Sequence, residues 1–198
     1  MQKKCQIYFI LFILILAIAI FFFLRNTKPD VDADRADISG EVIRQIGMNL
    51  GVQGVRDPID LGRSKFSFEG FGPGKSHEGK FDEWNGDIFI EDRKIIGFEG
   101  KIQTKSVNTG ISKLDKYLKN EDFFNIDKYP VIKFISRDLK NNQLVGDLTF
   151  LGRTKEIGFP VIISDESISA DFIIDTSLFG EMSDLANDEV RIFFELVK

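Results

Sequence analysis

Apolar and polar side chains alternate along most of the chain from Ser64 onward. In KFSFEGF, for example, Phe66 and Phe68 point to one side, whereas Ser67 and Glu69 point to the other. Strict alternation is typical of antiparallel sheets with one dry face and one wet face. The pattern predicts eight strands, near residues 64–71, 79–90, 94–104, 131–139, 143–151, 156–163, 168–174 and 189–197.

Turn signals separate the predicted strands. They are the pairs Asp92-Arg93, Asn141-Asn142, Gly152-Arg153 and Asp165-Glu166. Paired asparagines tolerate the positive φ angles that tight hairpins need. Eight such strands could close into an antiparallel barrel with room for one ligand, and a two-sheet sandwich is the alternative packing of the same pattern.

One segment breaks the alternation. Between residues 105 and 130, Ile111, Leu114, Asp115 and Leu118 fall at helical spacing and share one face. This spacing predicts a short helix that crosses between strands and caps one end of the barrel.

Residues 1–25 are predicted to anchor the chain in a membrane. The run from Ile7 to Leu24 is apolar throughout, two lysines precede it, and Arg25 closes it. As a helix it would span about 27 Å, close to the hydrocarbon thickness of a bilayer. A cleaved signal peptide is the alternative, although its apolar core usually has only about 7–15 residues. The basic residues favour an N-terminus inside the cell and the bulk of the chain outside the cytoplasm.

Residues 26–63 are predicted to form a tether and a lead-in segment before the domain at 64–198. The stretch RNTKPDVDADRAD, at 25–37, is charged and suits a solvated linker. Within 38–63, apolar residues fall at helical spacing, so a short amphipathic helix is the alternative there.

The chain offers little material for catalysis or metal binding. His77 is the only histidine and Cys5 the only cysteine, so neither a His-based metal site nor an intramolecular disulfide can form. The stretch GFGPGKS is similar to a P-loop, but only three residues separate Gly70 from Gly74, where the motif has four. We interpret it as a glycine-rich hairpin connection. The prediction is a non-enzymatic protein with no cofactor and no metal, and a hydrolase of lipid-like substrates would require a polar cluster around His77.

Charge and aromatic content narrow the function further. Acidic side chains outnumber basic ones, 31 to 26, and no basic run is present, which excludes nucleic acid as a partner. The chain has 20 phenylalanines, many of them on the inward faces of the predicted strands. Such residues could form a packed core or line an apolar tunnel, and composition alone favours neither.

Three stretches of the sequence resemble the YceI-like family, lipocalin-like proteins that bind polyisoprenoid lipids. The first is HEGKF, from His77 to Phe81, and the last is GDLTFLGRTKEI followed by Phe179-Gly180. The densest is SVNTGISKLDKYLKNEDFFNIDKYPVIKFIS, where the matching residues are Ser106, Thr109, Gly110, Asp115, Leu118, Asp122, Phe123, Phe124, Tyr129, Pro130, Phe134 and Ser136. Order and spacing agree across well over half the chain.

The chain departs from the family pattern at two places. Where the family usually has R-D-x-H-L, this chain has Leu114-Asp115-Lys116-Tyr117-Leu118, so both the arginine and the histidine are absent. Where an Arg-x-Asp is expected before Phe179, Thr176-Ser177-Leu178 stands instead. If those polar groups hold a ligand headgroup, these changes alter the headgroup preference.

The resemblance implies an all-β fold, an eight-stranded antiparallel lipocalin-like barrel with a short helical crossover, here behind an N-terminal transmembrane helix. It also implies a hydrophobic tunnel that takes up a long-chain isoprenoid or quinone-like lipid in a periplasmic or other extracytoplasmic position. A structural role suits Ser106, Thr109 and Asp115 as well as a binding role does: they could fix the connection after the third strand. The candidate tunnel-lining residues are Phe68, Trp84, Phe98, Ile102, Phe134, Leu148, Phe159 and Phe172.

Two questions stay open from the sequence. A barrel filled by its own side chains, working as an extracytoplasmic interaction module, is the alternative to a lipid carrier. The sequence also leaves open whether the chain is a monomer or a homodimer.

Overall fold

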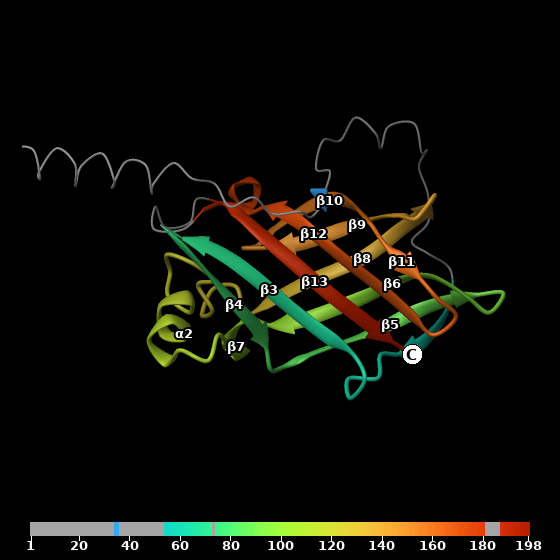
Figure 1. The fold of residues 1–198 in the computed structure, drawn as a ribbon, viewed down its shortest axis with the longest axis horizontal. Helices are drawn as coiled ribbons and strands as arrows, with labels where there is room; N and C mark the ends of the chain where they lie inside the picture. The colour runs from blue at the N-terminus through green and yellow to red at the C-terminus, as the bar shows by residue number, and fades with distance from the viewer. Residues whose placement is uncertain (1–33, 36–53, 73, 181–186) are drawn as a thin grey trace, which may run out of the picture.

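The computed structural model describes residues 34–35, 54–72, 74–180 and 187–198, which form two sheets and one short α-helix (Figure 1). One sheet has the strand order β1-β12-β13-β3-β4-β7, with β11 paired to β12. Its strands are β1 (Asp34–Arg35), β3 (Lys65–Gly72), β4 (Lys75–Phe81), β7 (Val107–Asn108), β11 (Ile162–Ile163), β12 (Ser167–Asp175) and β13 (Glu189–Val197).

The second sheet has the order β10-β9-β8-β6-β5-β2. Its strands are β2 (Val55–Pro58), β5 (Trp84–Glu91), β6 (Lys94–Gln103), β8 (Val131–Lys140), β9 (Gln143–Phe150) and β10 (Arg153–Pro160). All pairs in the two sheets are antiparallel except β1 with β12, which is parallel.

The all-β class and the antiparallel pairing are confirmed, but the predicted closed barrel is not found. Strand pairing in the described part of the chain gives two separate sheets rather than one continuous ladder of eight strands. The sheets pack face to face, since rings from both meet in the core: Phe98 of β6 lies 5.2 Å from Phe194 of β13, between ring centroids. The two-sheet alternative therefore describes the pairing better.

Two predicted hairpins turn where expected. Asp92-Arg93 joins β5 to β6 and Asn141-Asn142 joins β8 to β9, and all four residues have positive φ. Two-residue hairpins need this conformation because its twist matches that of the strands. The GFGPGKS stretch links the antiparallel strands β3 and β4, with Gly72 opposite Lys75, so it is a hairpin connection and not a P-loop.

The predicted strand at 79–90 is wrong in one respect, because it is two strands in different sheets. β4 ends at Phe81 and β5 begins at Trp84. Ser106, which lies in a later segment of the chain, stabilises the corner between the two strands. The amide of Asp82 donates to the Ser106 carbonyl at 3.0 Å, and the amide of Glu83 donates to Ser106 Oγ at 3.0 Å. Phe81 and Trp84 both line the interior although they are three positions apart. Residues on one face of a single strand are an even number of positions apart, so this break in the alternation marks the corner.

The predicted crossing helix is present as α2 (Ser112–Leu118), between β7 and β8. It lies beside β4 and β7 at one end of the two sheets (Figure 1). The 3₁₀ turns η2 (Thr104–Ser106) and η3 (Thr176–Phe179) follow β6 and β12.

The predicted anchor at 1–25 and most of the segment 26–63 lie outside the described residues. Where the structure does describe that segment, β1 pairs with β12 and β2 pairs with β5, so part of the predicted tether and lead-in belongs to the sheets. No helix within the described ranges is long and apolar enough to span a membrane.

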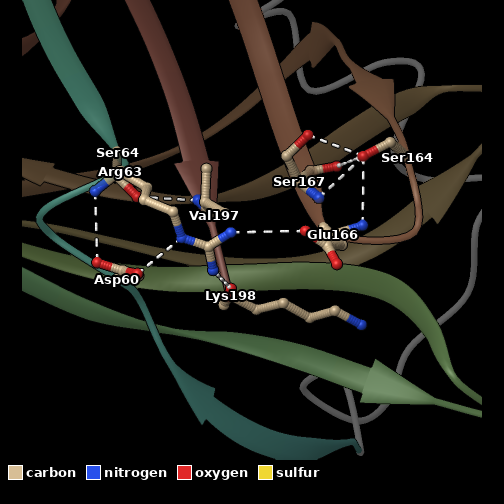
Figure 2. A network of polar contacts seen from close by, with 8 residues as sticks. All are labelled: Asp60, Arg63, Ser64, Ser164, Glu166, Ser167, Val197 and Lys198. Atoms are coloured by element: carbon tan, nitrogen blue, oxygen red, sulfur yellow. Dashed lines mark hydrogen bonds and ion pairs between the residues drawn. The ribbon is translucent and has the colours of Figure 1, made fainter.

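A polar network ties the end of β13 to two loops (Figure 2). The amide of Asp60 donates to the Val197 carbonyl at 2.8 Å, and the amide of Lys198 donates to the Glu166 carbonyl at 3.0 Å. Arg63 joins the parts, since its guanidinium contacts the Asp60 carboxylate at 2.8 Å, Glu166 at 3.5 Å and the Lys198 carbonyl. Asp60 follows β2 of one sheet and Val197 ends β13 of the other, so the network links the two sheets at this end.

The network makes stability depend on pH. The hydrogen bond from Arg63 lowers the pKa of Asp60 below its ordinary value of 3.8. A depressed folded-state pKa contributes stability above the unfolded value, and this contribution is lost as the pH falls through the folded value. We expect the free energy of unfolding by urea to fall more steeply below pH 3.8 in the wild type than in an Arg63→Gln variant. Parallel curves would show that the Asp60 hydrogen bond is not coupled to folding.

Candidate functional site

A cavity of about 300 Å³ lies between the two sheets and under α2, and it is partly open to solvent. This volume falls at the lower end of the range for small-molecule sites, roughly 300–1,000 Å³. Its walls are almost entirely apolar, and phenylalanine is their commonest residue. The phenylalanines of the wall are Phe66, Phe68, Phe71, Phe81, Phe98, Phe123, Phe124, Phe134, Phe150, Phe159, Phe172 and Phe194.

The structure brings all the candidate tunnel-lining residues to this one cavity. They come from both sheets, and the set is Phe68, Trp84, Phe98, Ile102, Phe134, Leu148, Phe159 and Phe172. Each lies on the inward side of its strand because side chains alternate between faces. Whether these side chains contact a ligand stays a prediction.

The lining residues differ in how deeply they are buried. Phe159 and Phe172 are buried, and their rings stack at 4.2 Å between centroids with an interplanar angle of 2°. Trp84 and Leu148 are only partly buried. Aromatic stacking therefore fills one part of the interior, while the cavity remains beside the more accessible residues. The interior is neither an empty tunnel nor a fully packed core.

Glycines shape the wall in two ways. Gly79 lies opposite Phe68, and an added Cβ would come within 2.3 Å of the Phe68 ring, so glycine makes room for that ring. Gly70 and Gly100 line the cavity, and an added Cβ would meet nothing within 4 Å at Gly70 and only the Asn85 carbonyl, at 3.9 Å, at Gly100. Sequence reasoning missed these two lining residues, although glycine at an inward strand position could have indicated them.

The loop before α2 is fixed by side-chain hydrogen bonds. Ser106 Oγ donates to the Gln103 carbonyl at 2.7 Å and accepts from the Glu83 amide. The Asp115 carboxylate accepts from the Thr109 amide at 2.7 Å and from Thr109 Oγ1 at 2.6 Å. These bonds hold the helix against the mouth of the cavity.

The residues of the resemblance therefore divide into two groups. His77, Thr109, Phe123 and Phe124 line the cavity. Ser106, Asp115 and Pro130 do not, and they hold the surrounding chain; the Pro130 carbonyl, for example, accepts from the Thr104 amide at 3.0 Å.

Helix α2 contributes lining residues that sequence reasoning did not select. Leu114, Tyr117 and Leu118 all face the cavity. The helical spacing of Leu114 and Leu118 was recognised, but the face they share was assigned to capping rather than to ligand contact, and Tyr117 was not placed on that face. The position of Leu114 and Tyr117 is notable because both replace polar residues of the family pattern.

His77 is half-buried and faces the cavity from β4, where it pairs with Gly70 of β3. The described residues contain no group of three or more His, Cys, Asp or Glu side chains placed to hold a metal ion. The residues of the lining that the structure describes contain no carboxylate, so they do not provide the polar cluster that a hydrolase would need around His77.

A comparison with known protein families identifies the family of this chain. The YceI-like domain matches residues 37–198. The chain belongs to the YceI-like domain family. The matched region includes β2, which was assigned to the lead-in segment from the sequence.

The chain is also similar to individual curated proteins. A UPF0312 protein of Staphylococcus aureus strain USA300 is 34% identical over 88 residues, which are 42% of this chain and 50% of that protein. The chain thus spans about half the length of the curated relatives that it matches.

Two solved structures share the fold. BcnA of Burkholderia cenocepacia has a TM-score of 0.64 at 24% identity, covering 71% of this chain and 99% of its own. A polyisoprenoid binding domain from Saccharophagus degradans, implicated in plant cell wall breakdown, has a TM-score of 0.56 at 16% identity, covering 70% and 95%. At these identities the likeness establishes the fold.

Proposed function

We propose that this YceI-like protein binds a long-chain isoprenoid-type lipid in the cavity between its sheets, without catalysing a reaction on it. The observation that carries the proposal is the apolar cavity itself, walled by phenylalanines from both sheets. The solved polyisoprenoid binding domain with the same fold supports this choice of ligand class. An interaction module with a filled interior would not need such a space.

The energetics of an apolar tail suit this site. Each methylene moved from water into an apolar cavity gains about 0.8 kcal/mol. About ten buried methylenes would supply roughly 8 kcal/mol, from which the cost of ordering the chain must be subtracted. Aromatic walls also let a branched tail pack at many positions, so affinity does not depend on one contact.

The place of the protein follows from its N-terminal segment. We infer that residues 1–25 hold the domain at the outer face of a cytoplasmic membrane, as a carrier or a sequestering protein. A tether raises the local concentration of a membrane-derived ligand without adding contacts. Quinone-like lipids, which carry isoprenoid tails, fall within the proposal. A single chain supplies both walls and α2, so a homodimer is not required for binding.

The test is to identify what the full-length protein carries. We expect native mass spectrometry of protein purified in nanodiscs, followed by solvent extraction, to recover one isoprenoid-type lipid per chain. Binding in solution has an internal probe, because Trp84 is the only tryptophan and it lines the cavity. Adding a prenyl quinone should quench its fluorescence saturably. An empty protein whose Trp84 emission does not respond would contradict the proposed function.

A further inference from the structure

The lining of the cavity differs between its two ends. Ile59 and Leu196 line it next to the network of Figure 2. His77, Thr109 and Tyr117 line it at the α2 end. A ligand with an apolar tail and a polar head would therefore lie with its tail toward Ile59 and Leu196 and its head under α2.

At the α2 end His77 can offer one hydrogen bond to either kind of head, but the lining brings no paired charge to an anion. Among the residues that the structure describes, the only lysine or arginine of the lining is Lys101, and its neighbours Gly100 and Ile102 face inward, so alternation directs the exposed Lys101 side chain outward. Thr109 Oγ1 already donates to the Asp115 carboxylate at 2.6 Å, and Thr176 Oγ1 donates to the Asp188 carbonyl at 2.7 Å. The carboxylate behind Thr109 would repel a phosphate brought to this wall.

The lysines of α2 do not supply a cation to the cavity lining. Lys113 and Lys116 lie on α2 but are exposed and outside the lining. Their attraction for an anion would act through solvent and be screened by salt. Helix α2 is itself too short to provide an anion site at its N-terminus, since it has seven residues. A buried phosphate needs paired charges or several hydrogen bonds, and arginine is the usual donor.

Two residues account for this chemistry. Leu114 and Tyr117 both face the cavity from α2. Neither residue carries a positive charge, so the described residues of α2 present no basic group to the head of the ligand.

We propose that the cavity selects lipids with an uncharged headgroup, such as an isoprenoid alcohol or quinone, over the phosphorylated form of the same tail. This inference rests on the proposed function and specifies its ligand. An uncharged head can accept or donate a hydrogen bond at His77 and be drawn inside. A diphosphate must stay in the solvent, which holds the first units of its tail out of the apolar cavity.

The experiment compares two ligands with the same tail on the full-length protein in zwitterionic nanodiscs. Geranylgeraniol and geranylgeranyl diphosphate each compete with a prenyl quinone that quenches Trp84. We expect the alcohol to displace the quinone at a concentration at least about tenfold lower than the diphosphate. Equal potency, or a preference for the diphosphate, would overturn the inference while leaving the proposed function in place. If neither ligand displaces the bound quinone, the inference fails; if the quinone itself does not quench Trp84, the proposed function fails.

A pair of variants separates the wall from the general charge of the protein. Leu114→Arg places a guanidinium in the cavity wall, and we expect it to narrow or reverse the preference for the alcohol. Ser112→Arg adds the same charge to an exposed position of the same helix, outside the lining, and should leave the preference unchanged. If the two variants change the preference equally, the selectivity does not arise from the cavity wall.

Discussion

Gly100→Phe is expected to weaken lipid binding about a hundredfold and to leave the fold intact. Gly100 faces the cavity from the middle of β6, and a Cβ there would meet only the Asn85 carbonyl, at 3.9 Å. The backbone therefore accepts a side chain, and a ring at this position would occupy the space that the tail needs. Displacing about four methylenes would cost roughly 3 kcal/mol of binding, or about a hundredfold in Kd.

The Gly100→Phe effect is measured by Trp84 quenching and by the lipid that co-purifies with the protein. Its matched control is Lys133→Phe, which adds the same ring to the exposed residue opposite Lys101 on β8. We expect that control to bind like the wild type. Thermal unfolding of Gly100→Phe should occur at or above the wild-type temperature, because glycine in a strand interior is itself destabilising. A stable Gly100→Phe protein that still binds lipid would place the ligand outside this cavity.

The sequence predicted the strands well where alternation ran unbroken between strong turns. β8, β9 and β13 lie close to their predicted ranges, because each has an inward apolar row and the first two meet at the paired asparagines. The missed break between β4 and β5 has a physical reason. The corner at Asp82-Glu83 is stabilised by Ser106, which lies far along the chain, and local periodicity does not carry such a contact.

Whether the sheets close into a barrel and whether a cavity remains between them could not be predicted either, because both depend on contacts between residues far apart in the sequence. Inward phenylalanines are compatible with one ladder or with two facing sheets, and the pairing that decides between them is long-range. The cavity depends on differences in volume between positions. Gly70 and Gly100 leave space in its wall, whereas Phe159 and Phe172, which also line it, stack on each other. Alternation identified the correct faces, but it contains no information on how completely the rings fill the interior.

The second large effect is expected at Ser136, which holds β6 and β8 together beyond the end of their regular pairing. The regular pairing stops at Glu99 opposite Ile135. Beyond that pair, the Ser136 hydroxyl links the two strands. It accepts from the Phe98 amide at 2.8 Å and donates to the Phe98 carbonyl at 2.8 Å. Ser136 has an exposed fraction of 0%. Ser136→Ala would leave two buried backbone groups without partners, and we expect a loss of about 2–4 kcal/mol in the free energy of unfolding by urea.

Two further variants test that explanation. Ser76→Ala, at an exposed position of β4, should change stability by less than about 0.5 kcal/mol. Gly97→Ala should be strongly destabilising in the wild type, because its Cβ would lie 2.2 Å from Ser136 Oγ. In the Ser136→Ala background that oxygen is gone, so the penalty of Gly97→Ala should shrink, giving a coupling of about 0.5–3 kcal/mol between the two sites. Additive effects would mean that the serine and the glycine do not act on one contact.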